Sequence, residues 1–178
     1  MTSRSTDLTQ FPPLHGTHTA DVLKDFVCRS DEQTEWLRRY ARQAHSAGTS
    51  RVMGVTEVDK SEVLAYYGWS MATVLTGDVP ERFRKGAGRY PQPVVLLARL
   101  GVSVEHEGRG LGAGLLGDVI GRTAQLGIEI GCRGLLVQAE SAEARDFYLH
   151  LVPEFELSPT DDLHLVLLMT DVLKTLAG

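Results

Sequence analysis

The residues of this chain that are best spaced for chemistry form a glycine-rich turn at residues 105–114, EHEGRGLGAG. Gly108, Gly110 and Gly112 are two residues apart. They follow an apolar run directly and open a segment whose apolar residues recur at helical spacing. Glycines in such a turn let successive backbone N–H groups point at one anion, and the N-terminus of a helix adds its dipole. The pattern therefore indicates a main-chain cradle for a phosphate or pyrophosphate group.

The glycines also have a structural interpretation, which stays open. Ten of the 18 glycines lie between Gly101 and Gly134, and several of them could simply let a helix pack closely against a sheet. Each glycine inside a helix costs about 1 kcal/mol relative to alanine, so glycines at 112, 114, 117 and 121 need a reason. A dinucleotide-binding fold would place such a turn near the start of the chain. Here the turn comes late, after two long strand-like segments, which disfavours that fold.

Other residues with reactive side chains give weaker signals. Tyr148 lies in a segment with helical spacing after Ser141, a residue suited to cap that helix; on spacing alone, Tyr148 fits a core aromatic. His106 is interpreted as a solvated turn residue, and Cys132 as a small apolar side chain of the interior. Cys28 and Cys132 fit neither a metal-ligand spacing nor a disulfide framework, so we expect no metal site.

Charge is unevenly distributed along the chain. The formal net charge of −5 argues at first against nucleic acid as a partner. Residues 36–100, however, carry ten basic and five acidic side chains, and eight of the ten are arginine, whose planar fork suits phosphate. Arg89 and Arg99 flank the end of a Pro- and Gly-containing loop at 76–93 and the start of an apolar run. Each fits a surface ion pair or a phosphate contact equally well.

The elements around the turn predict an α/β fold. Residues 93–104 form a near-continuous apolar run, typical of a strand that is covered on both faces, and Gly101 within it suggests a bulge or a splay. A strand, a glycine-rich turn, a helix and a second strand in this order require at least one crossover unit. The remaining expected elements are helices at 18–28, 31–47 (begun by Asp31 and ended by Gly48) and 142–151, strands at 51–56, 63–72, 135–139 and 164–169, and a short C-terminal helical turn.

Length and composition limit the number of domains and the kinds of segment that this chain can contain. At 178 residues we expect one domain at 18–178, preceded by a flexible, polar extension at 1–17. The N-terminal sequence lacks the apolar stretch of a signal peptide. No apolar run approaches the roughly 20 residues of a membrane helix. We therefore expect a cytoplasmic protein with no membrane partner.

The run VVLLARLGVSVEHEGRGLGAGLLGDVI resembles the acetyl-CoA-binding core of the GNAT superfamily of N-acetyltransferases. The family pattern has Gln or Arg, two residues, Gly, one residue, and Gly or Ala; it falls here on residues 107–112, with Glu107 as the departure. A carboxylate near phosphates has no explanation in the sequence. The resemblance implies a mixed, mostly antiparallel twisted sheet with splayed central strands and flanking helices.

A closer resemblance, over about residues 18–170, is to the TacT-type toxins. It is carried by LLARLGVSVEHEGRGLG, by the residues around Ala139 and by DFYLHLVPEFELSPTDDLHLVLLM. It implies an enzyme that acetylates the α-amino group of aminoacyl-tRNA with acetyl-CoA, a ribbon-helix-helix antitoxin as partner, and a homodimer.

The resemblance also implies roles for single residues. Tyr148 would be the general acid that protonates the leaving thiolate, and Ser141 would cap its helix and touch the cofactor near its thiol. Arg89 and Arg99 would lie where the acceptor end of tRNA enters. The other cofactor-binding residues would be Leu100, Val102 and Val104 along the strand and Gly108, Arg109, Gly110, Leu111, Gly112 and Ala113 in the turn.

Two other functions stay open. One is a housekeeping acetyltransferase that acts on a small amine or a protein N-terminus; the other is a non-catalytic acyl-CoA-binding protein. Retention of both the glycine turn and Tyr148 disfavours the non-catalytic protein. The basic segment at 36–100 favours tRNA as the substrate over the small amine or protein N-terminus of a housekeeping enzyme.

Overall fold

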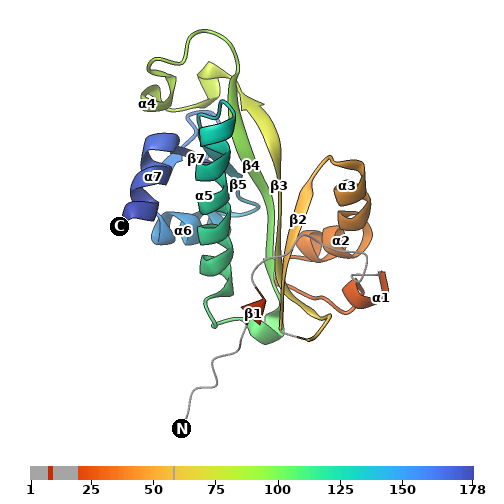
Figure 1. The fold of residues 1–178 in the computed structure, drawn as a ribbon. Helices are drawn as coiled ribbons and strands as arrows, with labels where there is room; N and C mark the ends of the chain where they lie inside the picture. The colour runs from red at the N-terminus through yellow and green to blue at the C-terminus, as the bar shows by residue number, and fades with distance from the viewer. Residues whose placement is uncertain (1–7, 10–19, 58) are drawn as a thin grey trace. The chain divides into compact units, whose positions relative to one another are not determined.

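The computed structural model describes residues 8–9, 20–57 and 59–178, so most of the expected extension at 1–17 lies outside the described residues. The chain divides into two compact units. Unit 1 comprises Met1–Gly68 and Arg99–Leu115, and unit 2 comprises Trp69–Ala98 and Leu116–Gly178. Their boundaries fall inside two strands, β3 (Val63–Val74) and β4 (Gln92–Val102), and inside helix α5 (Leu111–Glu129), all labelled in Figure 1.

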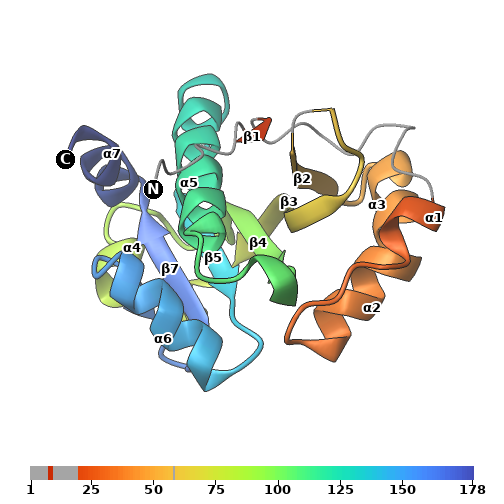
Figure 2. The same ribbon diagram turned by 90° about the horizontal axis from the view of Figure 1, so that it is seen from below.

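The helices of unit 1 are shorter than their apolar spacing predicts. α1 spans only Ala20–Leu23, because the chain after it becomes extended: Cys28 forms a β-bridge with Ser103, and the Val104 N–H donates to the Val27 carbonyl at 2.9 Å. The single helix expected at 31–47 is two helices, α2 (Asp31–Arg39) and α3 (Ala41–Ala47). Both views show α1, α2 and α3 together beside β2 (Figures 1 and 2).

Local capping explains where these helices begin, break and end. Ser30, rather than Asp31, caps α2, since its Oγ accepts the Gln33 N–H at 3.1 Å. Tyr40 leaves ideal helical geometry at φ −112°, and α3 then lies against β2 (Arg51–Glu57), where the Val52 N–H donates to the His45 Nδ1 at 3.0 Å. Gly48 ends α3 with φ +73°, as expected.

Tyr66 organises the core of unit 1. Its ring stacks on Trp36 and meets Phe26 edge to face, and its hydroxyl donates to the Gln33 carbonyl at 2.7 Å. A Cβ at Gly101 would lie 2.9 Å from the Tyr66 ring, so close approach of this ring explains the glycine within β4.

Unit 2 is built on paired strands, and its C-terminal helix packs against two of them. β4 pairs in parallel with β5 (Gly134–Gln138) over residues 95–97; β5 is antiparallel to β7 (His164–Leu168), which is antiparallel to β6 (Glu156–Leu157). α6 (Ala142–Leu151) precedes β6, and α7 (Met169–Ala177), longer than the helical turn expected, packs on β5 and β7. The strand order β1-β2-β3-β4-β5-β7-β6, with β1 at Leu8–Thr9, confirms the mixed, mostly antiparallel sheet.

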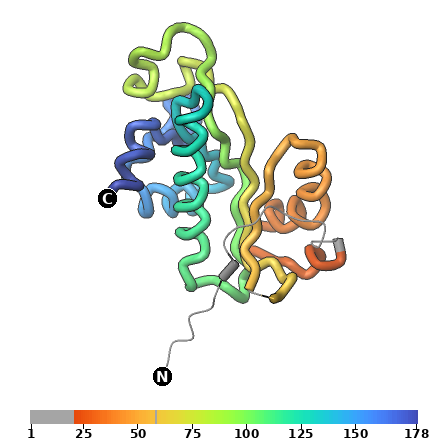
Figure 3. The backbone as a smooth tube through the Cα atoms, viewed as in Figure 1, coloured from red at the N-terminus to blue at the C-terminus, as the bar shows by residue number. Residues whose placement is uncertain are grey.

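The segment at 76–93 is more ordered than a plain loop. It holds a 3₁₀ turn at Thr76–Asp78 and the short helix α4 (Glu81–Arg84), and its path between β3 and β4 is seen in Figure 3. Arg82 anchors this segment. Its guanidinium donates two hydrogen bonds to the buried carboxylate of Asp171 on α7 and a third to Glu156. In the part of the chain that the structure describes, no helix is both long and apolar enough to cross a membrane.

Candidate active site

The glycine-rich turn has the backbone geometry of an anion cradle. Gly108 and Gly110 have φ of +75° and +77°, values that a side chain disfavours, and an added Cβ at either would meet nothing within 4 Å. α5 begins directly afterwards at Leu111, and the Gly114 N–H donates back to the Gly110 carbonyl at 3.0 Å. The N–H groups of residues 111–113 therefore precede the first intrahelical bond and are available to an anion.

Close packing does not explain Gly117 and Gly121, which lie in the helix that follows the turn. A Cβ added at Gly117 or Gly121 would have no neighbour within 4 Å, whereas one at Gly127 would collide with the Met169 side chain. The structural interpretation of the glycines thus applies to Gly127 and not to Gly117 or Gly121.

The structure supplies a partner for Glu107, the residue that departs from the family pattern. Arg29 forms a bidentate ion pair with this carboxylate, with Nε 2.8 Å from Oε1 and Nη2 3.0 Å from Oε2. The pair neutralises a negative charge that adjoins the turn. Sequence reasoning missed Arg29, because the two residues are 78 positions apart and no local pattern joins them.

The three strand residues assigned to the cofactor do not all lie within β4. Leu100 and Val102 lie within β4, beyond the residues 95–97 that pair with β5. Val104 lies past the strand, in a 3₁₀ turn at Val104–His106, and its N–H is already bonded to the Val27 carbonyl. Of the three residues, therefore, only Leu100 and Val102 have their backbone within the strand.

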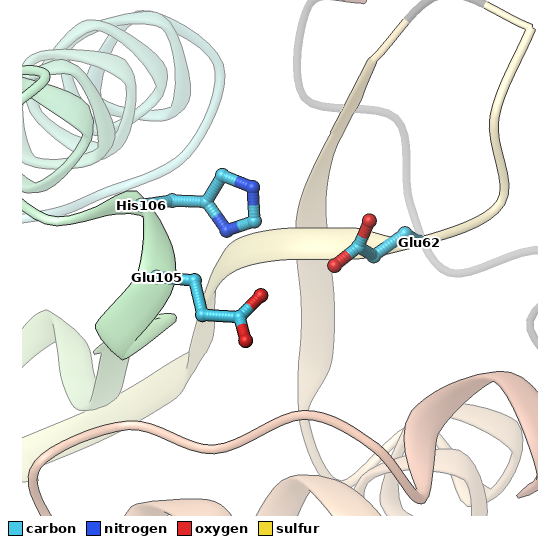
Figure 4. Close-up of side chains that lie close together, drawn as sticks. All are labelled: Glu62, Glu105 and His106. Carbon is cyan, nitrogen blue, oxygen red and sulfur yellow. The ribbon is translucent and has the colours of Figure 1, made fainter.

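His106 is buried, with 9% of its surface exposed, so the expectation of a solvated turn residue is wrong. Its Nδ1 lies 3.2 Å from the Ser103 Oγ, and its ring faces Glu62 and Glu105 (Figure 4). The potential ligand atoms of these three side chains lie within 4.8 Å of one another. The two glutamates are exposed, and no further observation points to an ion, so we assign no metal to them.

Glu62 and Glu105 also line an open pocket of about 300 Å³, together with Asp25 and several apolar side chains. Three carboxylates give this pocket a negative charge that opposes binding of phosphate. Of these two features of unit 1, the turn at 108–113 therefore has the surroundings better suited to an anion.

Tyr148 is a buried phenol whose hydroxyl is not used by the fold. The side chain on α6 is 6% exposed, and its ring meets Phe147 and Phe155 edge to face, with centroids 5.3 and 6.4 Å away. The hydroxyl forms no hydrogen bond with another described residue. Burial, reinforced by the charge of Glu140, raises the pKa of Tyr148 well above its ordinary value of 10. The phenol therefore keeps its proton at neutral pH and can act as a donor.

Ser141 caps α6 as expected, because its Oγ accepts the Ala144 N–H at 3.1 Å. Cys132 is half-buried, and its thiol donates to the Gly134 carbonyl at 3.3 Å. Neither residue shows the surroundings of a nucleophile.

The two arginines assigned to tRNA differ in their surroundings. Arg99 lies 2.7 Å from the Glu32 carboxylate, and its guanidinium is 5.3 Å from the centre of the Trp36 ring. Of the two interpretations of Arg99, the structure shows the ion pair. Arg89 is exposed and forms no ion pair within the described chain.

No family model matches the sequence. A tRNA-acetylating toxin of Mycobacterium tuberculosis is 43% identical over 152 residues, which cover 85% of this chain and 89% of that protein. AtaT complexed with acetyl-methionyl-tRNAfMet superimposes with a TM-score of 0.83 at 23% identity, over 97% of this chain and 100% of that one. A tyrosine-to-phenylalanine variant of AtaT, bound to acetyl-CoA and the C-terminus of its antitoxin AtaR, gives a TM-score of 0.76 at 21% identity, over 97% and 99%.

Proposed function

This chain belongs to the family of tRNA-acetylating toxins, and from that premise we propose that it transfers the acetyl group of acetyl-CoA to the α-amino group of an aminoacyl-tRNA. The observation that carries the proposal is the 43% identity across 85% of the chain, in a protein that keeps the anion cradle at 108–113. The acetyl-CoA and the acetylated tRNA bound to the AtaT structures support the same chemistry.

The residues present fit acetyl-CoA, which supplies an activated acetyl thioester. The N–H groups of Leu111, Gly112 and Ala113, with the turn at 108–110, would hold its pyrophosphate, because they are unbonded within the helix and lie at its positive end. The backbone of Leu100 and Val102 would pair with its pantetheine arm. The Arg29–Glu107 pair would keep the carboxylate from repelling the phosphates, and exposed Arg109 would add positive charge.

Tyr148 would act as the general acid of the reaction. The departing thiolate needs a proton, and the Tyr148 hydroxyl, whose pKa is raised by burial, carries one at neutral pH. The α-amine of an aminoacyl ester is weakly basic and partly neutral at cellular pH, so the proposal requires no protein base. Ser141 is assigned to capping, since its Oγ is already bonded to the backbone.

For the RNA, the proposal assigns a phosphate contact to Arg89 and not to Arg99. The Arg99 guanidinium is already held by Glu32 and Trp36, whereas that of Arg89 is exposed without an ion pair. The protein would work in the cytoplasm, where charged tRNA is found.

An antitoxin would neutralise the protein. AtaT is bound by the C-terminus of AtaR, and a ribbon-helix-helix protein is the kind of partner that the resemblance implies. A homodimer is likewise proposed from the resemblance. Expression of this chain alone should arrest growth, and co-expression of its antitoxin should relieve the arrest.

The test is acetyl-CoA turnover, followed as release of free CoA thiol. Charged tRNA should stimulate release strongly, and the same tRNA stripped of its amino acid should not. A housekeeping acetyltransferase would instead respond to small amines or peptide N-termini and ignore charged tRNA. Failure of charged tRNA to stimulate release would reject the proposed function.

A further inference from the structure

The loop at residues 84–90, RKGAGRY, presents an aromatic ring to solvent. Tyr90 is 81% exposed, more than any other aromatic side chain whose burial is described, and α4 ends where the loop begins. Its chain neighbours include Arg84, Lys85 and Arg89, all exposed. An exposed aromatic ring flanked by cations is typical of surfaces that bind single-stranded nucleic acid. The ring stacks on a base, and the cations contact phosphates.

The shape of this loop is held from the inside. Gln92 is buried, and its Nε2 donates to the carbonyls of Ala87 and Tyr90 at 2.5 and 2.6 Å. Arg133 donates through Nη2 to the carbonyls of Phe83 and Lys85 at 2.7 and 3.3 Å. Two polar side chains thus satisfy four carbonyls in and beside the loop. The backbone of the loop, including that of Tyr90, is therefore held in place by these hydrogen bonds.

The cations of the loop are not neutralised. Within the described chain, Arg84, Lys85 and Arg89 form no ion pair. Arg82, just before the loop, pairs with Asp171 and Glu156. In a chain of net charge −5, three uncompensated cations within six residues make a local positive field that attracts phosphate.

We propose that the 84–90 loop binds a single-stranded segment of RNA, with an unpaired base stacked on Tyr90 and the adjoining phosphates held by Arg84, Lys85 and Arg89. A duplex offers phosphates, but its bases are already stacked on one another. An acidic peptide would use the cations and leave the exposed ring without a role. The identity of the RNA as an aminoacyl-tRNA rests on the proposed function; the preference for an unpaired base does not.

The test compares two RNA probes that carry no amino acid: a short hairpin with a four-nucleotide 3′ overhang, and the same hairpin with a blunt end. In fluorescence anisotropy titrations the intact chain should bind the overhang more tightly. Tyr90→Ala should weaken binding of the overhang by about 5- to 100-fold and leave the blunt hairpin unchanged, since the variant cannot stack on a base. Tyr90→Phe keeps the ring and should bind like the intact chain. Tyr40→Ala, at another exposed tyrosine (52%), is the matched control and should have no effect.

The cations should act on both probes. Arg84→Gln combined with Arg89→Gln should weaken both hairpins and reduce the slope of log affinity against log salt by about 0.7 for each phosphate that the variant no longer neutralises. Unchanged overhang binding by Tyr90→Ala, or an equal loss of affinity for both probes, would overturn the assignment of Tyr90 to an unpaired base. Failure of the proposed function is seen separately, as absence of CoA release with charged tRNA by the intact chain. If that function holds, Tyr90→Ala should raise KM for charged tRNA and leave acetyl-CoA affinity unchanged.

Discussion

Replacing Tyr148 by phenylalanine separates a packing role of this residue from a role in proton transfer. The substitution removes one oxygen atom and keeps the ring, with its edge contacts to Phe147 and Phe155. Because the hydroxyl forms no hydrogen bond with another described residue, the fold loses no interaction. We expect the free energy of unfolding to change by less than about 0.5 kcal/mol, below the value of an average hydrogen bond.

The effect on rate should be much larger. Loss of a positioned proton donor lowers turnover by roughly 100-fold or more, which corresponds to about 2.7 kcal/mol of activation free energy. Acetyl-CoA affinity should stay the same, because the proton is needed in the transition state and not in the ground state. Since burial raises the pKa of Tyr148, the intact enzyme should lose no activity between pH 7 and 9 through ionisation of this phenol.

The assay pairs thermal unfolding and acetyl-CoA calorimetry with the rate of acetylation of charged tRNA. Tyr40→Phe, at an exposed tyrosine, is the control and should leave all three quantities unchanged. A near-normal rate for Tyr148→Phe, with stability and cofactor affinity intact, would refute the proton-donor role and leave Tyr148 as a core aromatic.

Three further changes test the cradle, its neighbouring ion pair and the fold. Gly110→Glu should abolish acetyl-CoA binding in calorimetry while the protein stays folded by circular dichroism, because the exposed turn contacts no other residue there; retained affinity would exclude the turn as the cofactor site. Arg29→Met should weaken acetyl-CoA binding by about threefold to tenfold by leaving Glu107 unpaired, and adding Glu107→Gln should restore it; no change in either variant would show that the pair is unrelated to the cofactor. Arg82→Met should lower the free energy of unfolding at pH 7 in urea titrations, because it leaves the buried carboxylate of Asp171 without this arginine. Because Arg82 lowers the pKa of Asp171, this contribution is present above about pH 4 and lost as pH falls further, so the difference between variant and intact chain should shrink in acid.

Features set by neighbouring residues were predictable from the sequence. The turn at 105–114, the strand before it and the helix after it depend on local glycine and apolar patterns, and the structure places Gly108 and Gly110 at positive φ. Ser141 caps α6, and Gly48 ends α3, for equally local reasons.

Features set by distant residues were not predictable. The shortening of α1 depends on the bridge of Cys28 to Ser103, and the partner of Glu107 lies 78 residues away at Arg29. His106 has the sequence context of a polar turn residue, yet the fold buries it beside Ser103. In the first two cases the deciding interaction joins segments that no local pattern relates.

The most direct test of the proposed activity identifies the product of the reaction. The protein is incubated with acetyl-CoA and a pool of charged tRNA, the RNA is digested with nuclease, and the 3′-terminal nucleosides are analysed by mass spectrometry. We predict N-acetyl-aminoacyl-adenosine, heavier than the unmodified species by one acetyl group, and none from a parallel reaction with Gly110→Glu. Unmodified aminoacyl-adenosine alone, from a folded protein that binds acetyl-CoA, would contradict the proposed activity.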